Sequence, residues 1–135
     1  MRKSYLPPFG KILTITLFLL LIGGSGLIFV FAFFEPRLGP RWMFFFFLTV
    51  FGAGCSLPAS YLIQRRFATQ IVSWNVLIRE AILFGVFLSL AAWLQLGRIL
   101  TNLIIVIIGV GFVLLEMLLR MAEKAAFKVD EDDEI

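Results

Sequence analysis

Two carboxylates, Glu80 and Glu116, are the side chains of this sequence best placed for chemistry, because each lies close to a long apolar segment. A carboxylate held at depth in a membrane can bind and release a proton or a cation, which is the chemistry of a coupled transporter. Glu116 lies four residues before Arg120, a spacing that allows an ion pair on a helix. Glu80 directly follows Arg79, near the start of its apolar segment. The sequence therefore also fits two interfacial charges that are paired or solvated, and we favour this interpretation.

Other reactive groups are scarce in this sequence. The chain has no histidine and a single cysteine, Cys55, so it lacks the commonest general base and metal ligand and cannot form an intrachain disulfide. No nucleophile can be paired with a nearby base, and no cluster of metal ligands can be assembled. We therefore expect no catalytic, cofactor-binding or metal-binding residues, no cofactor and no enzymatic activity. Cys55 is interpreted as a small packing residue.

The composition indicates an integral membrane protein. Of 135 residues, 61% are hydrophobic and 16 are phenylalanine, whereas 16% are charged, well below the roughly one quarter that is usual in a soluble domain. The apolar residues concentrate in four segments, residues 12–34, 42–63, 78–96 and 99–119, and the first two contain no charged residue. As a helix, the 22 residues of the second segment would extend about 33 Å, close to the thickness of a bilayer core. The sequence therefore predicts an all-α membrane protein with four transmembrane helices in an antiparallel up-down bundle.

The other segments divide the chain into a basic tail (residues 1–11), a transmembrane domain (12–128) and an acidic tail (129–135). Residues 64–77 are half apolar, so we expect them to lie along the membrane interface or to extend the third helix. Consecutive acidic residues cannot bury enough apolar surface to fold, which predicts disorder in the last segment. A signal peptide also begins with basic and then apolar residues, but residues 12–34 exceed the usual apolar core and lack an Ala-x-Ala site. We expect them to remain in the protein.

The basic residues predict the orientation of the chain. If both termini lie on one side, that side holds Arg2, Lys3, Lys11, Arg65, Arg66, Arg79, Arg120, Lys124 and Lys128. The other side then holds only Arg37, Arg41 and Arg98. The side richer in basic residues faces the cytoplasm. We therefore expect both termini and the 64–77 loop to be cytoplasmic, in the plasma (cytoplasmic) membrane, and the net charge of +3 gives no case for binding nucleic acid.

Small residues are spaced for close packing between helices, because helices in lipid gain from close backbone approach at small side chains. Two series lie 3, 7 and 11 residues from the cytoplasmic ends of the second and third apolar segments, and they are Ser60, Ser56, Gly52 and Ala81, Gly85, Ser89. A further patch in the first segment contains Gly23, Gly24 and Gly26. We predict that the two series face each other, or that each receives a helix from another subunit.

The sequence is compatible with two functions. The first is a non-catalytic accessory or assembly subunit that packs against partner membrane proteins. The alternative is a small homo-oligomeric transporter or channel with its path between protomers. The chain resembles small multidrug-type transporters in length and number of spans, but residues 12–34 contain no counterpart of the carboxylate that this family has in its first helix. The expected partners are membrane lipid and either other membrane proteins or further copies of this chain.

Overall fold

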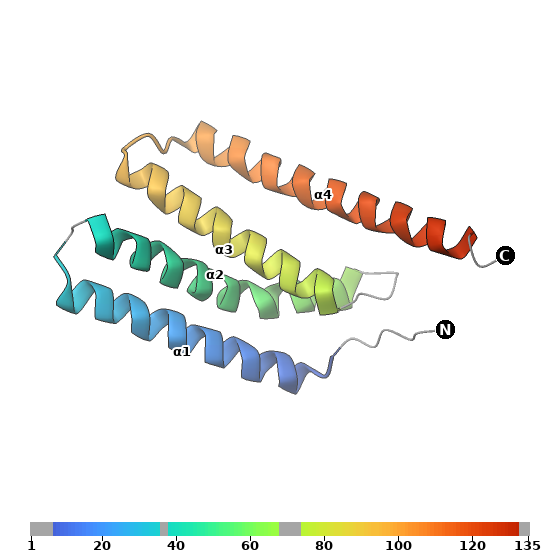
Figure 1. Ribbon diagram of the computed structural model, residues 1–135, viewed down its shortest axis with the longest axis horizontal. Coiled ribbons are helices and arrows are strands. Elements are labelled where there is room, and N and C mark those ends of the chain that lie inside the picture. The colour runs from blue at the N-terminus through green and yellow to red at the C-terminus, as the bar shows by residue number, and fades with distance from the viewer. Residues whose placement is uncertain (1–6, 36–37, 68–73, 133–135) are drawn as a thin grey trace. The chain divides into compact units, whose positions relative to one another are not determined.

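All regular secondary structure in the described part of the chain is α-helical. The computed structural model describes residues 7–35, 38–67 and 74–132. It contains four helices (Figure 1): α1 (Phe9–Phe33), α2 (Leu38–Phe67), α3 (Trp74–Leu96) and α4 (Asn102–Asp132). Each helix contains a segment that is long and apolar enough to cross a membrane. The expected all-α, multi-pass membrane fold with four candidate spans is confirmed at this level.

Proline sets the limits of α1. Pro8 precedes the helix as its N-cap, and its carbonyl accepts a hydrogen bond of 2.9 Å from the Lys11 amide. The helix ends at Phe33, and Phe34 is already extended with φ −117° and ψ 130°. Glu35 precedes Pro36, and a residue before proline is sterically disfavoured from helical geometry. These prolines therefore confine α1 to 25 residues.

The second helix continues through an internal proline. Pro58 lies within the 30 residues of α2 and has no N–H to donate, so the carbonyl of Gly54 loses its usual helical donor. Transmembrane helices tolerate such a proline where neighbouring helices cover the freed backbone group. Gly54 is buried against α1, where an added Cβ would lie 3.1 Å from Leu19 Cβ. Packing against α1 therefore shields this position from lipid.

The helices extend beyond most of the apolar segments. The second and third segments were expected at residues 42–63 and 78–96, whereas α2 ends at Phe67 and α3 begins at Trp74. Helical hydrogen bonding continues past the apolar residues, so hydropathy marks only the part suited to lipid. For the same reason α4 continues to Asp132, into the tail that was expected to be disordered from residue 129. Residues 1–6, 68–73 and 133–135 of the predicted tails and loop lie outside the described residues.

A tight turn follows α3. Arg98 has a φ of 55°, the left-handed conformation that often ends a helix. The Arg98 amide donates to the Gln95 carbonyl at 3.0 Å, and the Ile99 amide donates to the Leu94 carbonyl at 3.1 Å. This pair of bonds satisfies two of the carbonyls left without partners at a helix C-terminus. The turn therefore ends α3 through hydrogen bonds between backbone groups.

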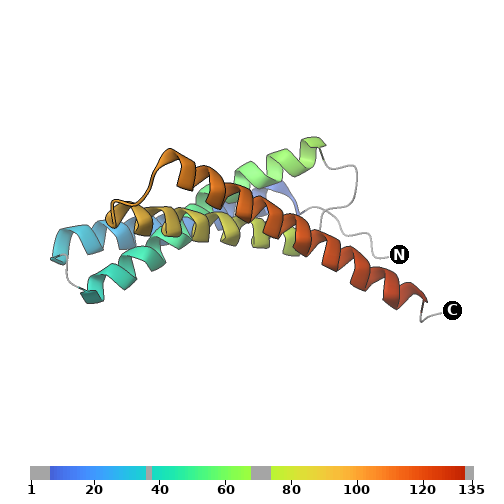
Figure 2. The same ribbon diagram turned by 90° about the horizontal axis from the view of Figure 1, so that it is seen from above.

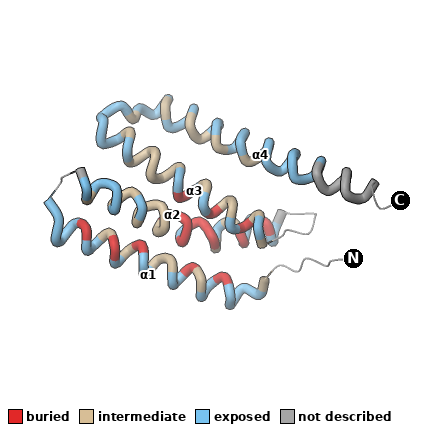
Figure 3. Tube along the Cα trace, in the orientation of Figure 1, coloured by how far each residue is buried: buried red, intermediate tan, exposed pale blue. Residues whose placement is uncertain are grey.

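The chain divides into two units, residues 1–99 with α1, α2 and α3, and residues 100–135 with α4. In the first unit α2 contacts both α1 and α3 (Figures 1 and 2). Buried positions lie along the sides where these helices meet (Figure 3). They form two apolar clusters, Ile12 with Tyr61 and Leu77, and Ala53 with Leu57 and Ala81. Each cluster takes residues from α2 and α3, so α2 carries the core of this unit.

Candidate functional site

A close helix contact in the first unit lies between α2 and α3 at two glycines. A Cβ added to Gly85 would collide with the Thr49 carbonyl oxygen and lie 3.2 Å from the Ala53 amide nitrogen. A Cβ added to Gly52 would lie 3.1 Å from the Gly85 Cα. Both glycines are buried. Glycine at these positions therefore allows two backbones to approach more closely than any larger residue would permit.

Short polar side chains connect the same two helices on either side of the glycines. The Thr49 and Ser89 hydroxyls are hydrogen-bonded at 2.7 Å, and Ser89 Oγ also donates to the Phe45 carbonyl at 3.1 Å. Ser56 Oγ shares its proton between the Ala53 carbonyl of its own helix at 3.1 Å and the Ala81 carbonyl of α3 at 3.4 Å. A hydrogen bond between membrane helices contributes about 0.6 kcal/mol on average. These bonds therefore support the glycine contact without dominating its energy.

The register between α2 and α3 differs by about one helical turn from the register expected from depth in the membrane. Counting from the ends of the apolar segments placed Ser56 level with Gly85 and Gly52 level with Ser89. In the structure Gly52 lies opposite Gly85, and Ser89 bonds to Thr49. The ends of the apolar segments are not defined well enough to fix the register of two helices to within one turn. In the structure, the register is the one that brings the two glycines together, where the backbones can approach closely. Ser60, the remaining member of the predicted series, is half-buried.

Two of the three glycines predicted in the first segment lie against α2. A Cβ on Gly23 would come within 2.7 Å of the Phe51 amide nitrogen, and one on Gly26 would collide with the Phe47 ring. A Cβ on Gly24 would lie 3.8 Å from the Phe51 ring, an ordinary van der Waals contact. Gly23 and Gly26 therefore set the separation of α1 and α2, and Gly24 does not.

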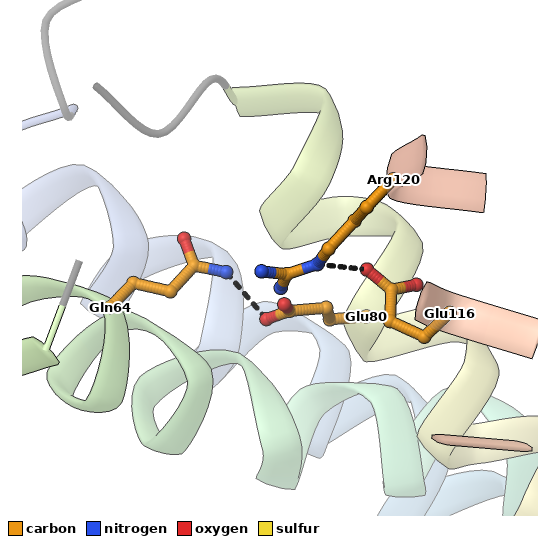
Figure 4. Close-up of polar contacts among 4 residues, drawn as sticks. All are labelled: Gln64, Glu80, Glu116 and Arg120. Atoms are coloured by element: carbon orange, nitrogen blue, oxygen red, sulfur yellow. Dashed lines mark hydrogen bonds and ion pairs between the residues drawn. The ribbon is translucent and has the colours of Figure 1, made fainter. Parts of the chain in front are cut away.

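A polar pair joins the C-terminal turn of α2 to the start of α3. Gln64 Nε2 donates to Glu80 Oε2 at 2.6 Å (Figure 4). Gln64 is only 6% exposed, and its Oε1 is buried without a hydrogen-bond partner among the described residues. Glu80 is half-buried. A carboxylate bonded to a buried amide has a defined position, so Glu80 is held by α2 as well as by its own helix.

The second predicted carboxylate belongs to an ion pair within α4. Arg120 Nε forms an ion pair with Glu116 Oε1 (Figure 4), and the two atoms are 2.8 Å apart. The Glu116 side chain is 18% exposed and the Arg120 side chain is 47% exposed. The two residues are four apart, which is the spacing expected for a stabilising pair on one helix face.

Three contributing residues were not singled out from the sequence. Thr49 and Gly54 lie inside the second apolar segment, and Gln64 is the first residue of the 64–77 segment. The available signal for Thr49 was its position seven residues before Ser56, on the same helix face. Nothing in the local sequence distinguishes Gln64 from an exposed loop residue, because its partner Glu80 is 16 positions away.

No metal-binding group of side chains is found in the described ranges. The described residues contain no group of three or more histidine, cysteine, aspartate or glutamate side chains that could hold a metal ion. Cys55, the only thiol of the chain, is exposed on α2. Comparisons of the chain with models of known protein families, with curated proteins and with solved structures found no match. The candidate site of this protein is therefore the packed surface of α2 with the Gln64–Glu80 pair at its end.

Proposed function

We propose that this protein is a non-catalytic accessory or assembly subunit that packs against partner proteins in the membrane. The proposal rests on the hydrogen bonds that the hydroxyl groups within the apolar segments make. The Thr49 and Ser89 hydroxyls bond to each other, and Ser56 bonds to the Ala81 carbonyl. A transport path needs polar groups directed toward a permeating solute, and these groups instead hold α2 against α3.

The outward surface of the first unit supports the same function. Large apolar side chains on α1 are exposed, among them Leu17 at 59%, Phe18 at 65% and Phe31 at 73%. Lipid or another apolar helix is the natural neighbour of such side chains in a bilayer. Association between membrane helices relies on close packing and on van der Waals contact. A partner could therefore cover these surfaces without any rearrangement of the α1–α2–α3 core.

The proposal includes an arrangement in the membrane. The four helices form an antiparallel up-down bundle in the plasma membrane, with both termini in the cytoplasm. Support comes from the excess of basic residues on that side, which is nine against three when the positions named above are counted. The segment 64–77, which includes the ends of α2 and α3 and the residues between them, then lies on the cytoplasmic side, as do the N-terminal tail and the acidic C-terminus.

This arrangement predicts the pattern of cysteine labelling. In a Cys55→Ser background, a cysteine replacing Gly39 should react with a membrane-impermeant maleimide added to intact cells. A cysteine replacing Ser73, which lies outside the described residues, should react only after the cells are opened. Native Cys55 should not react in intact membranes, because its position in α2 places it in lipid. Labelling of the Gly39 position only after opening would reverse the proposed orientation.

A small homo-oligomeric transporter or channel is the second candidate, and the Gln64–Glu80 pair is the observation that favours it. A half-buried carboxylate beside a buried amide is a group that could exchange a proton or cation. If the protein is an accessory subunit instead, Glu80→Gln should leave it folded, because the new amide oxygen can still accept the hydrogen bond from Gln64. Glu116→Gln should cost at most about 1 kcal/mol, since its ion pair is partly exposed.

The flux measurement that separates the two functions uses proteoliposomes loaded with a pH-sensitive dye. We expect the wild type, Glu80→Gln and Glu116→Gln to show the same proton leak as protein-free liposomes. The exposed residue Glu123 on α4 provides a matched control, Glu123→Gln. A wild-type proton flux that Glu80→Gln or Glu116→Gln abolishes in folded protein, and that Glu123→Gln leaves intact, would establish the transporter in place of the accessory subunit.

A further inference from the structure

Two buried polar atoms have no hydrogen-bond partner among the described residues, and they are Thr16 Oγ1 and Gln64 Oε1. Thr16 is 5% exposed and Gln64 is 6% exposed. A buried polar group without a partner costs free energy, and within the hydrocarbon of a bilayer no water can replace the missing bond. Each atom therefore marks a place where a small movement of a helix would supply a partner.

Thr16 faces the turn of α2 that contains the internal proline. On one side of this turn, Ile12 of α1 packs with Tyr61 of α2. On the other side, a Cβ added to Gly54 of α2 would lie 3.1 Å from the Leu19 Cβ of α1. Thr16 is buried between Ile12 and Leu19, so its hydroxyl lies level with the α2 residues between Gly54 and Tyr61.

The acceptor that matches this hydroxyl is the Gly54 carbonyl. Pro58 has no N–H, so the Gly54 carbonyl lacks its helical donor. A carbonyl of an α-helix points along the axis toward the residue four positions further on, which directs this one toward the level of Thr16. Thr16 and Gly54 are both buried where α1 meets α2. A donor and an acceptor that both lost their usual partners therefore lie in one interface without being bonded to each other.

The movement that would join them is the bend that a proline favours. The ring of Pro58 crowds the Gly54 carbonyl, and a helix relieves this clash by kinking. The two residues are four apart and share the face toward α1, so a larger kink opens that face and moves the last turns of α2 away from α1. Gln64 belongs to these turns. The part of α2 before the proline is held by close contacts of Gly52 with α3 and of Phe51 with α1.

We propose that Pro58 is a hinge in α2 and that the Thr16 hydroxyl is its latch, which donates to the Gly54 carbonyl in the more bent position. The last turns of α2, which include the exposed Arg65, then have two positions relative to α1. A hydrogen bond between membrane helices contributes about 0.6 kcal/mol, which changes the ratio of two positions about threefold. The inference rests on the α1–α2 contact and is independent of the accessory function.

The test is electron paramagnetic resonance of the full-length protein in liposomes, with nitroxide labels on cysteines at the exposed positions Lys11 and Arg65 in a Cys55→Ser background. We expect two distances between the labels. Thr16→Val keeps the shape of the side chain and removes the hydroxyl, so it should lower the ratio of the longer to the shorter distance about threefold. Pro58→Ala restores the amide donor and should remove the longer distance, and Thr16→Val should have no further effect in that background.

Thr14→Val serves as the matched control, because the Thr14 hydroxyl is exposed and donates to the Gly10 carbonyl of its own helix at 2.9 Å. It should leave the ratio unchanged. A single distance in the labelled protein, or a longer distance that persists in Pro58→Ala, would overturn the hinge. An unchanged ratio in Thr16→Val, or an equal change in Thr14→Val, would show that the Thr16 hydroxyl is not the latch.

Discussion

Replacing Gly85 with leucine should separate α3 from α2. The added side chain would begin at a Cβ that already collides with the Thr49 carbonyl and lies 3.2 Å from the Ala53 amide nitrogen. These are backbone atoms of a helix, so they cannot move aside as a flexible side chain could. Overfilling a packed site costs about 1–3 kcal/mol, and more where the backbone must shift. We expect the upper end of this range or beyond.

A cysteine pair provides the readout for this change. Thr49 and Ser89 are hydrogen-bonded at 2.7 Å, so cysteines at both positions should crosslink readily in a Cys55→Ser background. Gly85→Leu should abolish the crosslink, whereas Val86→Leu should preserve it, because Val86 is exposed on the next position of the same helix. Equal crosslinking in the two variants would show that the glycine contact does not hold the helices together.

The second large effect is expected at two adjacent glycines of α1. Gly23→Ala should destabilise the protein, because its Cβ would come within 2.7 Å of Phe51 N and 2.8 Å of Phe51 Cα. Gly24→Ala should be neutral or slightly stabilising, since its Cβ would lie 3.8 Å from the Phe51 ring. Alanine also favours a helix over glycine by about 1 kcal/mol in a water-exposed helix. This gain is the same at both positions, so the contrast comes from the contact with Phe51 alone.

The two alanine variants change adjacent residues at nearly the same depth in the membrane, so each serves as a control for the other. Thermal unfolding in detergent, followed by loss of the monodisperse peak on size exclusion, should show a lower midpoint for Gly23→Ala than for Gly24→Ala. Matching midpoints would mean that α1 tolerates displacement from α2, and that the close approach at Phe51 is not required for stability.

The spans of this protein can be predicted from sequence because the bilayer imposes a simple requirement. A helix of about 20 apolar residues satisfies its own backbone and crosses the hydrocarbon core, and the four apolar segments meet this condition. The helix ends are harder to predict, because hydropathy does not determine where hydrogen bonding stops. The continuation of α4 to Asp132 is one example.

The packing contacts depend on pairings that the sequence does not specify. Helix spacing indicated that small residues would lie on one face of α2, but the same face is compatible with several registers one turn apart. The Gly52–Gly85 contact decides among them in the structure. Gln64 shows a further limit, since its burial depends on Glu80 in another helix. The sequence does not distinguish Gly23, Gly24 and Gly26 from one another. The structure does, because Gly23 and Gly26 lie too close to Phe51 and Phe47 for a larger residue and Gly24 does not.

The central claim is that this protein acts by packing against other membrane proteins. Its most direct test is purification in a mild detergent from the cells that produce it, with the mass and subunit ratio of the product measured by size exclusion and quantitative mass spectrometry. We predict a complex that contains one or more different membrane proteins in a fixed molar ratio to this chain, and a Gly85→Leu variant that loses them. A product made only of copies of this chain would contradict the claim.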